Sequence, residues 1–293
     1  MSDTGLPDLE QFLTGPTAAV ARVAPETMIL AAGGTRRAAA LAGVSPQSEE
    51  YVSWTYRRMN DCFSLIFDHG VRHLFTFAII STQLAEETAV YRERLLKWVD
   101  WGLAGPQALA DYQQAGWRVR LLGSESLPEL AATADRLRTQ TPANSDRTLW
   151  WYVVPSPESQ WEWLLAAVRR SQAQTRAEAI QALYGEAIPL ASLYLGFGKP
   201  LVSPSLFPPL LVGKMHCYWT QQPGYGLSQR ALRHIFYDYA YLRSTWQKDK
   251  TGRAETAVAQ RSAWERGPIL GLGQPLGPFW YPHPYENNVT EEG

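Results

Sequence analysis

Two adjacent arginines follow a pair of glycines in the run Gly33-Gly34-Thr35-Arg36-Arg37. The apolar stretch Thr27–Ala32 comes before this run and is typical of a buried parallel strand. Paired glycines allow a tight turn and a close approach of the backbone to a ligand. A helix that begins after such a turn adds free N–H groups and the positive end of its dipole, and the arginines add forked donors. The run therefore indicates a phosphate or diphosphate site, although it lacks the lysine of a P-loop. The alternative is a strand–turn–helix joint with solvated arginines.

The composition is that of a globular protein rich in aromatic residues. Of 293 residues, 45% are hydrophobic and 19% are charged, which is enough to build the core of one large domain or two small ones. The 12 Trp, 14 Tyr and 9 Phe fit a core or the lining of a pocket for a large apolar ligand. A net charge of −1 makes nucleic acid an unexpected partner.

Cysteine usage and hydropathy point to the cytoplasm. Cys62 and Cys217 are the only cysteines, and they form neither a disulfide framework nor a metal-type spacing. The sequence begins without a basic-then-apolar signal pattern, and no apolar run approaches the roughly 20 residues that span a bilayer. We therefore expect a cytoplasmic protein with no membrane span.

Strand-like apolar runs alternate with helical patterns along the chain. The expected strands are Thr27–Ala32, His73–Ser81, Trp117–Gly123, Thr148–Val154, Leu190–Gly196 and Met215–Thr220. The expected helices are Gln47–His69, Leu84–Trp101, Leu127–Arg138, Pro157–Tyr184 and Leu227–Tyr241. This alternation predicts a single α/β domain with a mostly parallel central sheet of about six strands flanked by helices. Ligands of such sheets bind beyond the carboxyl ends of the strands, where the Gly33–Arg37 turn is expected.

The organisation of the chain follows from this pattern. We expect an N-terminal surface segment over residues 1–24, an α/β domain over 25–246, and a C-terminal extension over 247–293 that packs near the active site or a partner subunit. The loop Gly196–Lys214 carries four prolines. Long irregular loops in compact domains are usually functional.

Further motifs lie at characteristic spacings from the Gly33–Arg37 turn and Tyr51. They are His69-Gly70, Ser81-Thr82-Gln83, Tyr184-Gly185-Glu186, Gly196-Phe197-Gly198, Val212-Gly213-Lys214 and the run from Leu232 to Arg243, Leu-Arg-His-Ile-Phe-Tyr-Asp-Tyr-Ala-Tyr-Leu-Arg. Together they resemble the motifs of the cis-prenyltransferase (Z-prenyl synthase) superfamily, from about Thr27 to Gly273. Within it they resemble the branch of tuberculosinol, tuberculosinyl adenosine and kolavelool synthases.

The resemblance implies an activity. Members of this branch ionise an allylic bicyclic C20 diphosphate of the clerodane or labdane type, such as kolavenyl diphosphate. Capture of the cation by water gives a diterpene alcohol, here kolavelool-like, and free diphosphate. The resemblance also implies a homodimer and a functional link to a class II diterpene cyclase. Two alternatives are a catalytically silent partner subunit with the same fold and a prenyl transferase to a nucleoside.

The resemblance also assigns site residues. Those expected to bind the diphosphate are Gly34, Thr35, Arg36, Arg37, Lys199 and Lys214. Arg36 and Arg37 would stabilise charge on the leaving group. Tyr51 and Tyr91 stand where the branch has tyrosines and would orient the nucleophile or the leaving group, and each fits core packing equally well. Loop lysines are more often solvated than bound to phosphate.

Gly33 is the main departure from the family pattern, because the family has Asp at this position. That Asp holds Mg²⁺ or assists the reaction, and glycine has no group for either role. His216 lies near the place of a Mg²⁺-binding Glu of elongating members. We therefore expect Mg²⁺ to be carried by the substrate diphosphate, with no protein ligand assigned. Glu49 and Glu50 are candidates for a relocated acid or base. A left-handed backbone at residue 33 is another explanation of the glycine.

Overall fold

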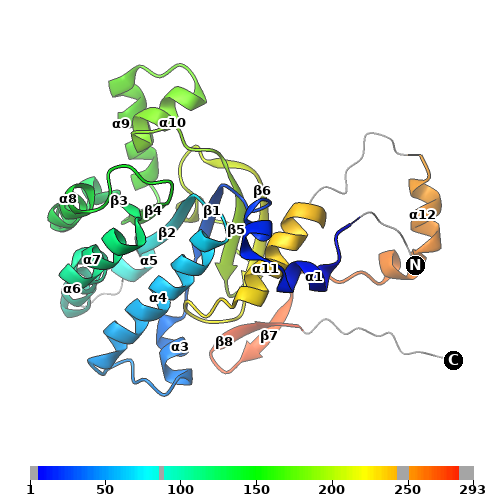
Figure 1. The fold of residues 1–293 in the computed structure, drawn as a ribbon. Helices are drawn as coiled ribbons and strands as arrows, with labels where there is room; N and C mark the ends of the chain where they lie inside the picture. The colour runs from blue at the N-terminus through cyan, green and yellow to red at the C-terminus, as the bar shows by residue number, and fades with distance from the viewer. Residues whose placement is uncertain (1–5, 86–88, 243–250, 284–293) are drawn as a thin grey trace.

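Six parallel strands form the central sheet in the order β3-β4-β2-β1-β5-β6 (Figure 1). The computed structural model describes residues 6–85, 89–242 and 251–283. The strands are β1 (Thr27–Ala31), β2 (His73–Ile80), β3 (Arg118–Leu122), β4 (Thr148–Val154), β5 (Ala191–Phe197) and β6 (Val212–Thr220). All five neighbouring pairs are parallel. The six expected strands and the α/β fold class are therefore confirmed.

Apolar side chains cover both faces of the sheet, as its near-continuous apolar strands require. All seven residues of β4 are buried. Trp151 packs into a cluster with α4 (Glu50–Asp68), α6 (Ala89–Ala104) and α11 (Gln229–Tyr237). Its neighbours Trp150 and Tyr152 point to the other face, toward α10 (Arg176–Tyr184) and the proline-rich loop. The sheet is thus a middle layer between two helical layers.

Two helical regions differ from the sequence pattern. The expected helix over 157–184 is two helices, because Gln172 adopts a left-handed φ of 55° and Thr175 begins the next helix with a capping box. A helix beginning at Pro106 was not expected. The remaining helices are α1 (Leu9–Thr14), α2 (Thr17–Ala21), α3 (Thr35–Leu41), α5 (Ser81–Leu84), α7 (Pro106–Ala115), α8 (Ala131–Gln140), α9 (Ser159–Ser171), α12 (Arg253–Ala259) and α13 (Arg261–Glu265). No helix in the described ranges is long and apolar enough to cross a membrane.

Arg233 of α11 ties the N-terminal helices to the domain. This side chain is 2% exposed and donates hydrogen bonds to the carbonyls of Leu13 and Gly15 and to Thr17 Oγ1. Its Nε also donates to Nε2 of His69 at 3.0 Å. Burial, and secondarily the charge of Arg233, lowers the pKa of His69, so its imidazole stays neutral and accepts this bond. The boundary near residue 24 stays a prediction.

The C-terminal region divides into two parts. Helices α12 and α13 lie away from the sheet, whereas strands β7 (Gly273–Leu276) and β8 (Phe279–Pro282) form an antiparallel hairpin near α3 (Figure 1). The expected extension over 247–293 also includes residues 247–250 and 284–293, which lie outside the described residues.

Candidate functional site

The turns after β1, β5 and β6 meet at one edge of the sheet. The three strands end together in register. Gly224 N–H donates to the carbonyl of Gly33 at 2.6 Å, and Gly198 N–H donates to the carbonyl of Thr220 at 3.0 Å. The Gly33–Arg37 turn therefore lies at the carboxyl edge, where parallel sheets bind ligands.

The ring of Phe197 packs directly on the glycine pair. A Cβ atom on Gly33 would lie 2.8 Å from Phe197 Cδ1, and one on Gly34 would lie 2.9 Å from Phe197 Cζ. Gly34 has the left-handed φ of 75° and precedes α3, whereas Gly33 does not have a positive φ. A left-handed backbone is therefore the wrong explanation for Gly33. In this chain the Phe197 ring leaves no room for a Cβ at position 33 unless the ring moves.

The two arginines have different surroundings. Arg36 is exposed, and its guanidinium lies over the ring of Tyr91 with Cζ 5.5 Å from the ring centroid. Arg37 Cζ lies 5.4 Å from the ring centroid of Phe197 and 3.6 Å from that of Phe279. Its Nε is buried and has no hydrogen-bond partner among the described residues. A desolvated guanidinium with an unpaired donor favours an anionic ligand.

Tyr51 joins α4 to the first turn of α3. Its hydroxyl lies 2.9 Å from Thr35 Oγ1, and its side chain is 7% exposed. The ring of Trp98 from α6 meets it edge-on, with the centroids 6.3 Å apart. Six of the residues expected from the sequence therefore lie in one region of the fold. They are Gly34, Thr35, Arg36, Arg37, Tyr51 and Tyr91.

A cavity of about 170 Å³ begins at Tyr51 and runs between α4, α6 and the sheet. Its lining is mostly aromatic and aliphatic and comprises Tyr51, Val52, Thr55, Tyr56, Met59, Phe77, Ala78, Trp98, Val99, Trp101, Gly102, Leu103, Trp151 and Tyr225. Two buried polar atoms on this lining, Thr55 Oγ1 and Trp151 Nε1, lack a hydrogen-bond partner within the described part of the chain. The site thus combines a cationic end with an apolar cavity that carries unpaired polar groups.

Lys214 does not lie with the arginines. It is the third residue of β6, at the amino edge of the sheet, and is exposed. Because β6 begins three residues before the expected Met215, Lys214 belongs to the strand and not to the loop, so its expected role is corrected. Lys199 is exposed and follows β5 at the same edge as Gly33. Glu49 and Glu50 are also exposed.

The described residues do not fit a protein-held metal site. They contain no group of three or more His, Cys, Asp or Glu side chains that could hold a metal ion. Gly33 supplies no carboxylate where the family has Asp, and His216 lies within β6. We therefore assign no metal ligand to the chain.

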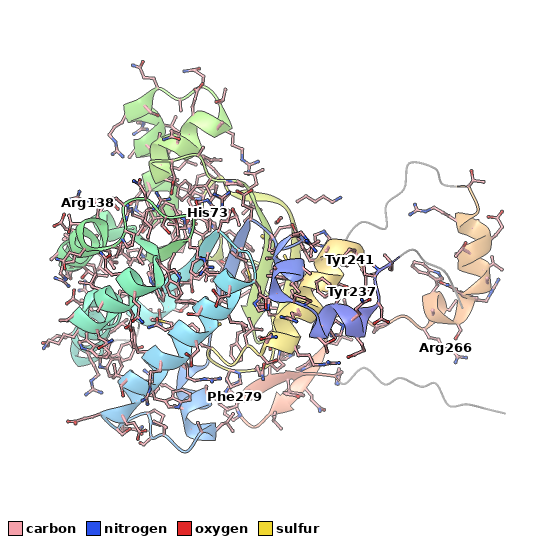
Figure 2. The ribbon with its side chains drawn as sticks, viewed as in Figure 1. His73, Arg138, Tyr237, Tyr241, Arg266 and Phe279 are labelled. Atoms are coloured by element: carbon pink, nitrogen blue, oxygen red, sulfur yellow. The ribbon has the colours of Figure 1, made fainter. Side chains whose placement is uncertain are left out.

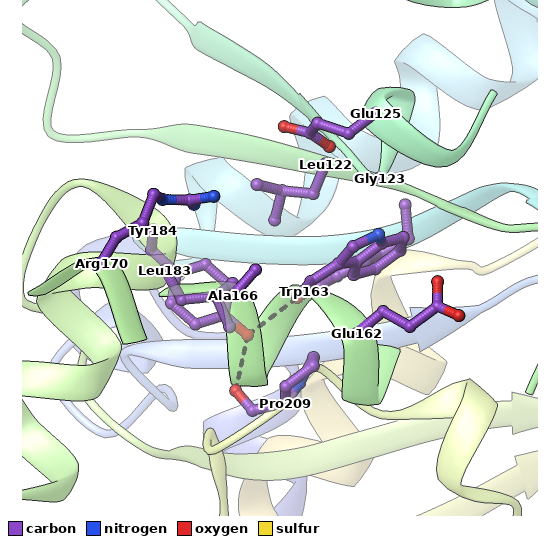
Figure 3. A pocket seen from close by; sticks show the side chains of 11 residues that line it. Leu122, Gly123, Glu125, Glu162, Trp163, Ala166, Arg170, Leu183, Tyr184 and Pro209 are labelled. Atoms are coloured by element: carbon purple, nitrogen blue, oxygen red, sulfur yellow. Dashed lines mark hydrogen bonds between the residues drawn. The ribbon is translucent and has the colours of Figure 1, made fainter. Parts of the chain in front are cut away.

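A second cavity of about 230 Å³ lies on the opposite face of the sheet, between β3, β4, α9 and α10 (Figure 3). Tyr184 donates to the carbonyl of Pro209 at one side of it. Glu125, Glu162 and Arg170 are its charged lining residues. With two carboxylates against one guanidinium, this cavity suits a diphosphate less well than the surroundings of Arg37 do.

Comparisons with known proteins identify the family. No family model matches the chain. The (+)-kolavelool synthase of Herpetosiphon aurantiacus is 49% identical over 276 residues, which are 94% of this chain and 96% of that protein. The chain belongs to the cis-prenyltransferase superfamily, in the branch of kolavelool synthase. It is therefore an enzyme of the terpene synthase class, as the sequence predicted.

More distant relatives agree with this assignment. The tuberculosinyl adenosine transferase of Mycobacterium tuberculosis is 27% identical over 80% of this chain and 83% of its own. Lavandulyl diphosphate synthase from Lavandula x intermedia, solved with dimethylallyl diphosphate, superposes with a TM-score of 0.57 at 15% identity, over 75% of this chain and 97% of its own. A probable undecaprenyl diphosphate synthase from Campylobacter jejuni superposes with a TM-score of 0.51 at 12% identity, over 76% of this chain and 98% of its own. The two structures support the fold alone.

Two aromatic residues of the site were not expected from the sequence. Phe197 was noted within Gly-Phe-Gly, and Phe279 fell within the expected C-terminal extension over 247–293, but neither was assigned a role. Figure 2 shows Phe279 at the end of the sheet where α3 lies. Its contact with Arg37 joins segments far apart in the chain, and no local pattern signals such a contact.

We expect Gly33→Ala and Gly33→Asp to destabilise the protein alike, by about 1–3 kcal/mol, because either Cβ would press on Phe197. Urea denaturation would measure this. Gly102→Ala is the matched control, since a Cβ there meets nothing within 4 Å. Adding Phe197→Leu to Gly33→Ala should restore part of the loss. A Gly33→Ala variant as stable as the parent would contradict the steric explanation.

Proposed function

We propose that the protein is a diterpene synthase that releases diphosphate from an allylic bicyclic C20 diphosphate and captures the cation with water. The substrate class is clerodane or labdane, with kolavenyl diphosphate as the first candidate and a kolavelool-like alcohol as the product. The observation that carries this proposal is a turn that holds the partly desolvated Arg37, with its unpaired donor, and whose Thr35 is hydrogen-bonded to Tyr51 on the lining of an aromatic cavity. The 49% identity to a kolavelool synthase supports the same reaction.

In the proposed complex the diphosphate lies at the carboxyl edge of the sheet. Arg36 and Arg37 donate to its oxygens, and the paired hydroxyls of Thr35 and Tyr51 lie beside them. Helix α3 has only seven residues, so the arginines supply more of the positive field than its dipole does. Lys199 is a further donor from the same edge. In this complex the phosphate lies outside the cavity and the carbon skeleton inside it.

The cavity constrains how the skeleton binds. Its volume of about 170 Å³ is below the about 300–1,000 Å³ of common ligand pockets. Trp101 on its lining is 43% exposed, so the cavity is open to solvent there. A C20 bicycle would therefore fill the cavity and extend past Trp101, or displace indole side chains as it enters.

Ionisation breaks the bond between the allylic carbon and the diphosphate oxygen, and the electron pair leaves with the diphosphate. The guanidinium groups of Arg36 and Arg37 stabilise the charge that develops on the leaving group. The positive charge left on the allyl unit faces the rings of Tyr51 and Trp98, whose π faces attract cations. This arrangement stabilises both charges of the separating pair without placing a carboxylate between them.

Water capture completes the reaction. The water oxygen bonds to an allylic carbon, and its released proton passes to a diphosphate oxygen, because Gly33 provides no carboxylate base. Thr55 lies one helical turn after Tyr51 on α4, so both line the same face of this helix. The Thr55 hydroxyl, which has no hydrogen-bond partner among the described residues, would hold the water in the cavity.

Magnesium enters this proposal only as part of the substrate. Bound to the diphosphate, Mg²⁺ neutralises part of its charge. The chain's contribution is made by the arginines, hydroxyls and aromatic rings already named.

We also propose a cytoplasmic homodimer that receives its substrate from a class II diterpene cyclase. The edge strand β6 and the apolar, exposed side chains of Leu201, Val202 and Val212 support self-association. A class II cyclase forms bicyclic diphosphates by protonation and leaves the diphosphate in place, which is the substrate that this site requires.

The direct test is incubation of the purified chain with Mg²⁺ and kolavenyl, copalyl, tuberculosinyl or geranylgeranyl diphosphate, followed by mass spectrometry. We expect a diterpene alcohol from a bicyclic substrate and little from acyclic geranylgeranyl diphosphate. A parallel incubation with added adenosine tests transfer of the diterpenyl group to a nucleoside. No diphosphate release above buffer from any substrate would reject the proposal in favour of a silent partner subunit.

We expect Arg36→Ala and Arg37→Ala each to lower kcat/KM by about 10²–10³, since each removes charge-assisted donors to the leaving group. Lysine at either position should rescue only in part, because the bidentate fork is lost. Arg138→Ala on α8 is the control for a lost surface arginine. Rates within a few-fold of the parent for both alanine variants would place the diphosphate elsewhere.

We expect Thr55→Val to shift the product from alcohol toward olefins formed by proton loss, with diphosphate release within a few-fold of the parent. Valine keeps the shape of threonine and removes the hydroxyl that would hold the water. Thr55→Ser should retain the alcohol. Product ratios by gas chromatography measure the effect, and an unchanged ratio in the valine variant would exclude this role.

A further inference from the structure

The β7–β8 hairpin contacts the arginine of the candidate site through the ring of Phe279. Phe279 begins β8, and its ring centroid lies 3.6 Å from Arg37 Cζ. Phe197 lies 5.4 Å from the same carbon, so two aromatic side chains from opposite parts of the chain contact one guanidinium. Figure 2 shows Phe279 on the hairpin at the α3 end of the sheet.

This geometry decides which part of Arg37 a ligand can reach. Rings that contact a guanidinium take up its faces and remove water from them, whereas its N–H groups point outward in its plane. The Nε of Arg37 is buried and has no hydrogen-bond partner among the described residues, so a ligand would meet the other N–H groups of the guanidinium. The contact therefore makes Arg37 a preorganised donor, because its planar fork is held before the ligand arrives.

Strand pairing and burial contribute little to holding the β7–β8 hairpin in this position. Its two strands pair over four residue pairs, and isolated two-stranded hairpins are marginal in water. Leu276 and Tyr281 are 60% and 45% exposed. Gly271, just before β7, approaches Pro200, since a Cβ on Gly271 would lie 3.7 Å from Pro200 Cγ. Phe279 itself is 44% exposed, so burial of its ring does not by itself account for its position.

We propose that Phe279 is a positioning residue for Arg37 and that the β7–β8 hairpin forms the outer wall of the diphosphate site. Its π face holds the guanidinium against Phe197, so that the N–H edge of Arg37 is directed at the bound diphosphate. The ligand chemistry is that of an inorganic or organic diphosphate. This inference rests on the proposed function for its site, but its first test needs no turnover.

Calorimetric titration of the full chain with inorganic diphosphate and Mg²⁺ gives that test. We expect Phe279→Ala and Phe279→Leu to weaken binding about threefold to thirtyfold, and Phe279→Tyr to bind as the parent does, because tyrosine keeps the aromatic face. Tyr281→Ala on the same strand should bind normally. Equal binding by the parent and Phe279→Leu would overturn the proposal.

A double-mutant cycle separates positioning from a general structural role. In an Arg37→Ala background, Phe279→Ala should cause no further loss of diphosphate affinity, since the group it positions is absent. Additive losses would overturn the proposal. Hydrogen exchange gives a second readout: diphosphate should slow exchange over residues 273–282 in the parent and not in Arg37→Ala. Diphosphate binding that follows this pattern without turnover of any diterpenyl diphosphate would reject the proposed reaction and retain this inference.

Discussion

The ring of Phe197 is the contact on which the rest of the site depends. It lies against Gly33 and Gly34 on one side and near the guanidinium of Arg37 on the other. A side chain at position 33 and this ring cannot occupy the same space without movement. In this chain the glycine pair and the position of the Phe197 ring near Arg37 therefore belong to one packing arrangement.

The lack of a carboxylate at position 33 changes the electrostatics of the site. A carboxylate beside Arg36 and Arg37 would offset their charge and share their donors. With Gly33 there instead, the guanidinium groups are left for an external anion, and Arg37 keeps a buried donor unpaired. In the proposed reaction these guanidinium groups would stabilise the departing diphosphate.

The sequence predicted those parts of the molecule that local patterns encode. Apolar runs identified all six strands, and the turn of the glycine pair and arginines lies at the carboxyl edge of the sheet, as expected. The anion site at this turn stays a prediction. Local patterns could not place Lys214, because hydrogen bonding to β5 extends β6 beyond its apolar run. They could not predict Phe279 against Arg37, since that contact depends on how the chain after residue 250 returns to the sheet. Tyr51 was expected at the site because of the motif resemblance. Its hydrogen bond to Thr35 depends on the packing of α4 on α3.

Helix α4 connects the two ends of the proposed reaction. Tyr51 contacts the anion end through Thr35, and Thr55 presents its unpaired hydroxyl one turn deeper in the cavity. One helical turn rises about 5.4 Å, a spacing that backbone hydrogen bonds hold more rigidly than a loop would. In the proposed reaction the departing oxygen and the entering water bond to carbons of one allyl unit, so the two groups must act close together. Because Tyr51 and Thr55 lie on one helix, the fold fixes the distance between them. The shape of the cavity wall is then what selects the diterpene skeleton.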